Sequence, residues 1–262
     1  MGRIKLTAKS LLLGNTLPLL AVFTALVSVI VLSGDFSFLT SRLLGISLLN
    51  RLTVTAFSLR MLKITLSVTG IVVSVLAVPG MSLGIERWFM LKAKGEAVRI
   101  RDIFYFFRIS GFLRCQSAFW YSFFIRAGVF LFFQFPAICL YGVLYTAVLQ
   151  GEAAYSVIAS VMAAGLLLSF TGAAFYFVYS AGWLLYPFII AADEALSPSE
   201  AYECSLGLVR ERVGKICIFR LSFLPWWLLC IFVFPLFYVW GYYRQSLAVL
   251  AFEGINKKTV DS

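Results

Sequence analysis

The sequence predicts an all-α fold: a polytopic transmembrane helical bundle with amphipathic helices at the cytosolic interface. Hydrophobic residues make up 61% of the chain and charged residues 13%, with a mean hydropathy of +0.94. Soluble domains hold roughly 45–50% apolar and about 25% charged residues. The apolar residues form runs long enough for a helix to cross a bilayer, which takes about 20 residues. The basic residues fall between these runs, as the positive-inside rule predicts.

We therefore expect a single integral membrane domain over residues 1–262, with about six spans, or about five if the last short helix does not cross. The first span is predicted at residues 11–32, a run longer than the roughly 7–15 apolar residues of a signal peptide. Residues 33–63 mix arginines with leucines, which favours an interfacial or partly buried connection. Residues 64–85 contain no charge and predict the second span.

The segment that follows, near residues 86–116, is predicted to be cytosolic because it is the longest basic stretch between apolar runs. This orientation also places the N-terminus in the cytosol. Aromatic and basic side chains alternate over residues 102–124, which predicts a helix lying at the headgroup level. The basic residues of this part of the chain are Arg87, Lys92, Lys94, Arg99, Arg101, Arg108 and Arg114.

The third span is predicted at residues 127–148. The next apolar run, residues 154–192, is much longer than a ~30 Å hydrocarbon core requires at about 1.5 Å per residue, so its end is expected to protrude into the cytosol. A fifth run covers residues 216–234 and ends at Pro235. A short apolar helix is predicted over residues 236–252.

A second cytosolic segment is predicted near residues 193–215. Ser197 and Glu200 have the spacing of a capping box, and Pro198 stands at the first helical position. We expect a helix from this cap to about Val213, with Gly214 as its C-terminal stop.

Four arginines are candidate contacts for lipid headgroups or other anions: Arg108, Arg114, Arg126 and Arg244. Arg244 lies partway down the last helix, so it must reach the interface or face a polar interior. Arg126 has two interpretations. Counted from a span that starts at Gln116, it lies roughly 15 Å deep and binds an anionic substrate or a lipid phosphate. If residues 127–148 form the span, it lies at the cytosolic boundary, which is the favoured interpretation.

The chain offers little for catalysis. It has no histidine, and its five cysteines form no CxxC motif, which argues against histidine chemistry, metal sites and a disulfide framework. The acidic residues lie outside the apolar runs or at their edges. We expect no enzyme activity, no catalytic residues, no metal and no cofactor. The basic residues alternate with apolar runs, which argues against nucleic acid as a partner.

The expected function is therefore non-catalytic: a membrane scaffold, an assembly factor or a component of envelope homeostasis. The alternative is a small-molecule or lipid transporter or permease component, since prolines stand in or beside most apolar runs and broken helices form many transport sites. Expected partners are membrane lipids and their anionic headgroups, and beyond these a protein partner or a second copy of the chain.

Two blocks of motifs occur in an ordered arrangement. The block at residues 79–107 holds Pro79-Gly80, Ser82-Leu83-Gly84, Trp88-Phe89, Gly95-Glu96, Asp102 and Phe104. The block at residues 186–252 holds Asp193, Leu196-Ser197, Glu200-Ala201, Ser205, Gly214-Lys215, Leu221-Ser222-Phe223 and Trp226. In this order they resemble the bacterial integral membrane family called domain of unknown function 975. The resemblance implies a multi-pass protein of the bacterial cytoplasmic membrane. It implies no activity, because none is established for the family.

Overall fold

A computed structural model describes residues 2–13, 18–24, 27, 56–149, 155–193, 195–210, 212–229 and 235–261. Within these ranges every regular element is a helix and no strand occurs, so the predicted all-helical class is confirmed for this part of the chain. Much of the predicted first span (residues 11–32) and most of the predicted connection (residues 33–63) lie outside the described residues.

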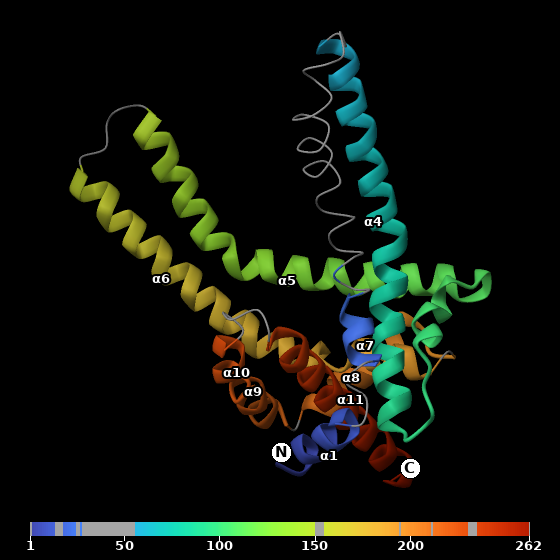
Figure 1. The fold of residues 1–262 in the computed structure, drawn as a ribbon. Coiled ribbons are helices and arrows are strands. Elements are labelled where there is room, and N and C mark those ends of the chain that lie inside the picture. The colour runs from blue at the N-terminus through green and yellow to red at the C-terminus, as the bar shows by residue number, and fades with distance from the viewer. Residues whose placement is uncertain are drawn as a thin grey trace.

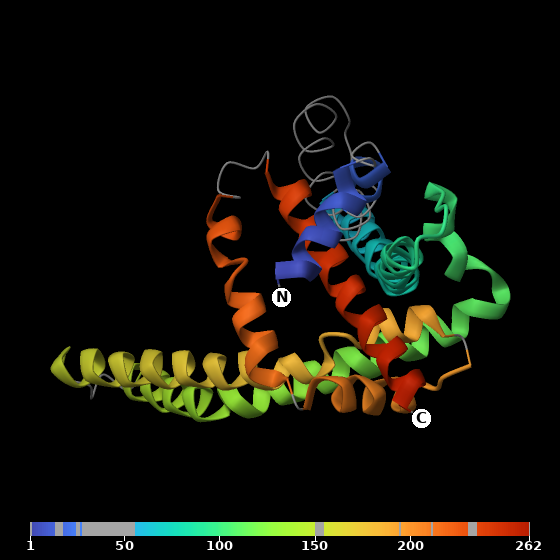
Figure 2. The ribbon, with the colours of Figure 1, turned by 90° about the horizontal axis from the view of Figure 1, so that it is seen from below.

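The helices divide into two parts (Figures 1 and 2). We call the long helices α4, α5 and α6 the arms, and the remaining helices, together with the ends of the arms that pack against them, the base. Helix α4 stands upright in Figure 1, while α5 and α6 run side by side and extend away from the base. The bounds are α1 Gly2–Leu13, α4 Ala56–Ala93, η1 Ile100–Phe107, α5 Ile109–Leu149, α6 Tyr155–Tyr179, η2 Ser180–Trp183, α7 Tyr186–Ala192, α8 Pro198–Arg210, α9 Val213–Leu221, α10 Leu224–Leu229 and α11 Leu236–Asp261, with a short helix at Pro18–Thr24.

The hydrophobic core lies in the base. It brings together Trp88 and Phe89 of α4, Phe188 of α7 and Leu247 of α11, all of them buried. Along the arms the large apolar side chains are instead exposed, as for Phe170 of α6 at 77%. A water-soluble protein rarely exposes so large an apolar surface, so the arms have the surface expected of lipid-facing helices.

Two helical stretches are long and apolar enough to cross a membrane: Gly111–Val148 and Tyr155–Ala192, each of 38 residues. A third would be added if α1 and Pro18–Thr24 together form one bent span. These stretches indicate a membrane protein. A ~30 Å hydrocarbon core takes about 20 helical residues at about 1.5 Å per residue, so each stretch holds more residues than one crossing needs. The second stretch is not one helix, because it is divided into α6, η2 and α7.

Helix α5 differs from the sequence prediction. Residues 102–124 were expected to form a helix separate from a span at residues 127–148. The structure instead has the short 3₁₀ helix η1, followed from Ile109 by 41 continuous helical residues. No proline stands between Ile109 and Pro136, and Arg126 itself has good helix propensity. Helix α5 changes direction along its length in Figure 1, and it contains Pro136, which lacks the N–H that the helix needs; proline is a usual cause of such a bend.

The segment after α7 also differs in its boundaries. Helix α8 ends at Arg210, earlier than the expected Val213, and Gly214 lies in the first turn of α9. Arg212 precedes α9 with a non-helical backbone (φ −129°, ψ 13°), so the chain breaks there rather than at the glycine. The expected fifth run, residues 216–234, is divided between α9 and α10, with the remainder outside the described residues.

The start of α8 carries reciprocal hydrogen bonds. The Ser197 backbone N–H donates to the Glu200 carboxylate (2.8 Å), and the Glu200 N–H donates to Ser197 Oγ (3.3 Å). The hydrogen bond from the Ser197 backbone N–H lowers the pKa of Glu200. The spacing of a serine and a glutamate three residues apart is thus sufficient to locate this helix start.

Glycine permits two close approaches between elements. A Cβ built on Gly84 would overlap the carbonyl oxygen of Ile103, where η1 packs on α4, and one built on Gly172 would overlap the carbonyl of Phe133, where α6 packs on α5. Gly128 is a matched contrast in α5, because a Cβ there would meet no atom within 4 Å.

We predict that Gly84→Ala destabilises the protein by about 1–3 kcal/mol, because the added methyl group forces η1 away from α4. Gly128→Ala should leave stability unchanged or raise it by up to about 1 kcal/mol, since alanine favours the helix over glycine. Thermal unfolding of the purified variants in detergent measures both effects. Equal melting temperatures for the two variants would contradict the observed packing of η1 on α4.

Candidate functional site

A cavity of about 210 Å³ lies where the base meets the arms. Its walls come from α5, α6, η2, α7, α9 and α11, so it exists only when these elements are assembled. The residues that line it are Arg126, Tyr176, Ser180, Trp183, Leu184, Pro187, Arg220, Tyr243, Arg244 and Leu247. Three of them are arginines and none is acidic, which makes the cavity strongly basic.

Arg126 reaches the cavity from α5. Its Nη2 donates one hydrogen bond, to the carbonyl of Trp183 at 3.4 Å, and its Nε is buried without a hydrogen-bond partner. The sequence left open whether this arginine lies at the membrane boundary or within a binding site. In the structure its guanidinium is half-buried inside the protein, in the wall of the cavity, with most of its donors unused.

Arg220 reaches the cavity from α9 and is firmly held. Its Nη1 donates to the carbonyl of Phe177 (2.7 Å) and to Ser180 Oγ (2.8 Å), and its guanidinium lies 4.0 Å from the centroid of the Phe177 ring. Tyr243 of α11 lines the same cavity. A planar guanidinium fixed by stacking and hydrogen bonds is oriented before any ligand arrives.

Arg244 reaches the cavity from α11 and forms an ion pair with Glu86 of α4. Glu86 is buried, at 2% exposure, and its second carboxylate oxygen has no hydrogen-bond partner. The adjacent Gln245 is also buried and donates to the Phe89 carbonyl at 3.4 Å. The pair therefore joins α4 to α11 and fixes the third arginine of the cavity.

The charges at the cavity do not balance. Glu86 contacts Arg244, whereas Arg126 and Arg220 donate to carbonyl and hydroxyl oxygens and contact no carboxylate among the described residues. Charges removed from water are costly unless they are paired, because the surrounding protein screens them less than water does. The arrangement therefore favours an anion that satisfies Arg126 and Arg220.

Two other predicted arginines lie elsewhere. Arg114 donates to the carbonyl oxygens of Asp193 (2.6 Å) and Leu196 (3.0 Å), and so secures the link between α7 and α8. Arg108 is exposed beside the Tyr105 ring, at 5.3 Å from its centroid. Of the four candidate arginines, the structure therefore brings together Arg126 and Arg244. Their predicted contact with lipid headgroups stays a prediction.

Neither the role of Arg220 nor the pairing of Glu86 was predicted from the sequence. One signal for the pair was available: Glu86 directly follows a long uncharged run, and Arg244 stands inside another apolar run. Opposite charges in two apolar surroundings are candidates for an ion pair. Nothing comparable marks Arg220, because a single arginine in a mixed segment is also typical of a side chain that reaches headgroups from a helix end.

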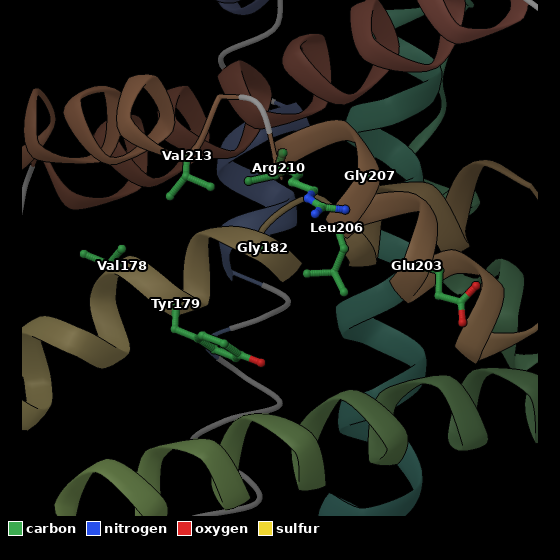
Figure 3. A pocket seen from close by; sticks show the side chains of 9 residues that line it. Val178, Tyr179, Gly182, Glu203, Leu206, Gly207, Arg210 and Val213 are labelled. Carbon is green, nitrogen blue, oxygen red and sulfur yellow. The ribbon is translucent and has the colours of Figure 1, made fainter.

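A second cavity, of about 610 Å³, lies between α6, η2, α8 and α9 (Figure 3). Its lining is mainly apolar, and Tyr179 and Leu206 point into it from opposite sides. Glu203 and Arg210 both come from α8 but point apart. Because no set of polar groups converges here, this cavity defines no ligand chemistry as sharply as the arginine-lined one does.

In the described part of the chain, no group of three or more histidine, cysteine or acidic side chains could hold a metal ion.

Comparison with protein-family models, curated proteins and solved structures finds no match for this chain. The resemblance to the family called domain of unknown function 975 therefore stays a prediction, and function must be argued from the site alone.

Lys92 of α4 lies beyond the predicted second span in the chain and is buried at 6% exposure. Its Nζ lies 4.6 Å from the centroid of the Trp88 ring and has no hydrogen-bond partner. Burial lowers the pKa of Lys92 to about 8. An unfolded chain restores the ordinary lysine pKa of about 10.4, so between about pH 8 and pH 10 the unfolded state binds more protons.

We predict that stability rises with pH from about 8 to about 10, as the buried Lys92 loses its charge in the folded state first. The Lys92→Met variant should be more stable than the natural protein at pH 7. Its stability should not show the rise between about pH 8 and pH 10 that comes from Lys92. Thermal unfolding in detergent across this pH range measures it. An identical pH dependence for the variant and the natural protein would show that Lys92 does not contribute to it.

Proposed function

We propose that the chain is a multi-pass protein of the bacterial cytoplasmic membrane that binds an anionic lipid headgroup without catalysing a reaction. In this role it acts as a membrane scaffold, an assembly factor or a component of envelope homeostasis. The observation that carries the proposal is the convergence of Arg126, Arg220 and Arg244 on one cavity, with Glu86 as their single contacting carboxylate among the described residues.

The shape of the molecule supports a membrane setting for this site. The arms expose apolar side chains and hold most of both candidate spans, while the base contains the core, including α7 at the end of the second candidate span. In Figures 1 and 2 the first part of α5 runs crosswise to α4. If α4 crosses the bilayer, that part of α5 lies along its surface, which agrees with the predicted interfacial position of residues 102–124.

The proposed topology has about six spans, with the N-terminus and the base in the cytosol. The basic residues of the segment near 86–116 support this orientation. The cavity would then lie at the level of the cytosolic headgroups, because it is formed where the arms leave the base. The cytosolic leaflet carries anionic lipids, so the expected ligand is abundant at that level.

The chemistry of the cavity supports binding rather than catalysis. Arginine stays protonated and is a poor general base. Ser180 Oγ accepts a hydrogen bond from Arg220 and donates one to the Phe177 carbonyl, so its hydroxyl is already engaged. Glu86 is paired with Arg244 rather than placed beside a nucleophile.

A second candidate function, transport of a lipid or small molecule, is favoured by one observation. Buried ionisable residues are typical of transport pathways, and Glu86 is such a residue, although the sequence had suggested that every acid lies at an edge. The ion pair with Arg244 gives Glu86 a structural role as well, so the binding function remains the better supported of the two.

We predict that the purified protein retains anionic lipid in preference to phosphatidylcholine, and that Arg126→Gln or Arg220→Gln lowers this retention about 10-fold or more, as expected for the loss of a charged hydrogen bond. Native mass spectrometry of the protein from mixed-lipid nanodiscs counts the retained lipids. Arg3→Gln is the matched control, because Arg3 of α1 is exposed, lies outside the cavity and is not among the predicted headgroup contacts.

The control should retain anionic lipid as the natural protein does. Two results would contradict the proposal: no preference for anionic lipid in the natural protein, or an equal loss in the Arg3 and Arg126 variants. The second result would mean that any surface arginine contributes through general electrostatic attraction.

A further inference from the structure

We infer that the arginine-lined cavity selects a phosphomonoester, a terminal phosphate joined to the rest of the lipid through one oxygen. The inference rests on the proposed function, because it names the class of headgroup that the same cavity takes. A phosphodiester headgroup, as in phosphatidylglycerol, is the competing class.

Charge is the first argument for a phosphomonoester. Arg126 and Arg220 remain without a contacting carboxylate among the described residues, whereas Arg244 is paired with Glu86. A phosphomonoester carries about −1.5 to −2 charges at pH 7, which matches the two unpaired guanidinium groups. A phosphodiester carries about one negative charge and would leave the second guanidinium unmatched.

The direction of the donors is the second argument. Arg126, Arg220 and Arg244 stand on α5, α9 and α11 respectively, so they approach the cavity from three different elements. A terminal phosphate has three free oxygens, and arginine bonds phosphate oxygens with two donors at once. A terminal phosphate therefore offers one oxygen each to the unpaired Arg126 and Arg220, and a third to the donors of Arg244 that Glu86 does not use, whereas a phosphodiester offers two free oxygens.

Arg126 and Arg220 also have N–H donors available for the phosphate oxygens. The Nε of Arg126 is buried without a partner, and its Nη2 makes one long hydrogen bond to the Trp183 carbonyl. Arg220 uses Nη1 to hold its place in the protein. Each guanidinium carries five N–H donors, so the contacts within the protein leave several of them for a ligand.

Size and surroundings point to a lipid as the source of the phosphate. At about 210 Å³ the cavity is smaller than the roughly 300–1,000 Å³ of pockets that enclose a whole drug-sized ligand, so it takes a headgroup alone. The acyl chains then lie outside, along apolar helix faces. Ile218, Leu221 and Leu224, near Arg220 in the chain, are exposed and suit such a contact.

The test compares the full-length protein in nanodiscs of phosphatidylcholine that contain an equal minor fraction of phosphatidic acid or of phosphatidylglycerol. Native mass spectrometry measures how strongly each anionic lipid is enriched on the protein. We expect phosphatidic acid to be enriched about 10-fold over phosphatidylglycerol, as an added charge-assisted contact would give. Arg126→Lys, which keeps the charge but loses the planar fork, should reduce that ratio, and Arg3→Lys should not.

The outcomes separate the two proposals. Equal enrichment of both anionic lipids over phosphatidylcholine would overturn the selection of a phosphomonoester while leaving the binding of anionic headgroups intact. Enrichment of neither would overturn both. The comparison of the two lipids on the natural protein decides the question even if the Arg126 variant does not fold.

A further experiment identifies the source of the phosphate. Inorganic phosphate is added to the phosphatidic acid nanodiscs at increasing concentration. Retention of the lipid at millimolar phosphate supports the lipid as the ligand, because the acyl chains add contacts that the free ion lacks. Displacement of the lipid by micromolar phosphate would overturn that source and identify a soluble phosphate as the ligand.

Discussion

The ion pair between Glu86 and Arg244 joins two helices that are far apart in the sequence, and the base is built around it. Taking the Glu86 carboxylate out of water is costly, and the loss of Arg244 would leave it buried and unpaired. Close to the pair in the chain, Trp88 and Phe89 of α4 and Leu247 of α11 belong to the hydrophobic core. The pair thereby fixes where α11 crosses α4, and it presents Arg244 to the cavity.

The arrangement of charge explains how one chain can combine a basic cavity with long apolar arms. The arms expose large hydrophobic side chains, which are stable only in lipid, whereas the base buries its hydrophobic residues. Arg126 lies on α5, one of the arms, yet its guanidinium turns into the cavity of the base. An anionic headgroup at this junction would satisfy the arginines while its acyl chains stay among the arms, which is why we connect the cavity to lipid.

The sequence predicted the features that arise from local chemistry. Composition indicated helices in lipid, and the spacing of Ser197 and Glu200 located the start of α8. Features that depend on distant contacts were not predictable. Glu86 and Arg244 are 158 residues apart, and the cavity needs six elements to assemble before Arg220 joins Arg126. The continuity of α5 was missed because an aromatic belt and a membrane span differ in composition but not in helix propensity.

The most direct test of the account is a double-mutant cycle on Glu86 and Arg244, with the free energy of unfolding measured in mixed micelles. We predict that Arg244→Gln costs about 3–5 kcal/mol, because it leaves the buried Glu86 carboxylate without its partner, and that Glu86→Gln costs less, because the Arg244 side chain is 34% exposed. The double variant should lose clearly less than the sum of the two, since it removes both charges. Strictly additive losses would contradict the account, because they would show that the two side chains do not depend on each other.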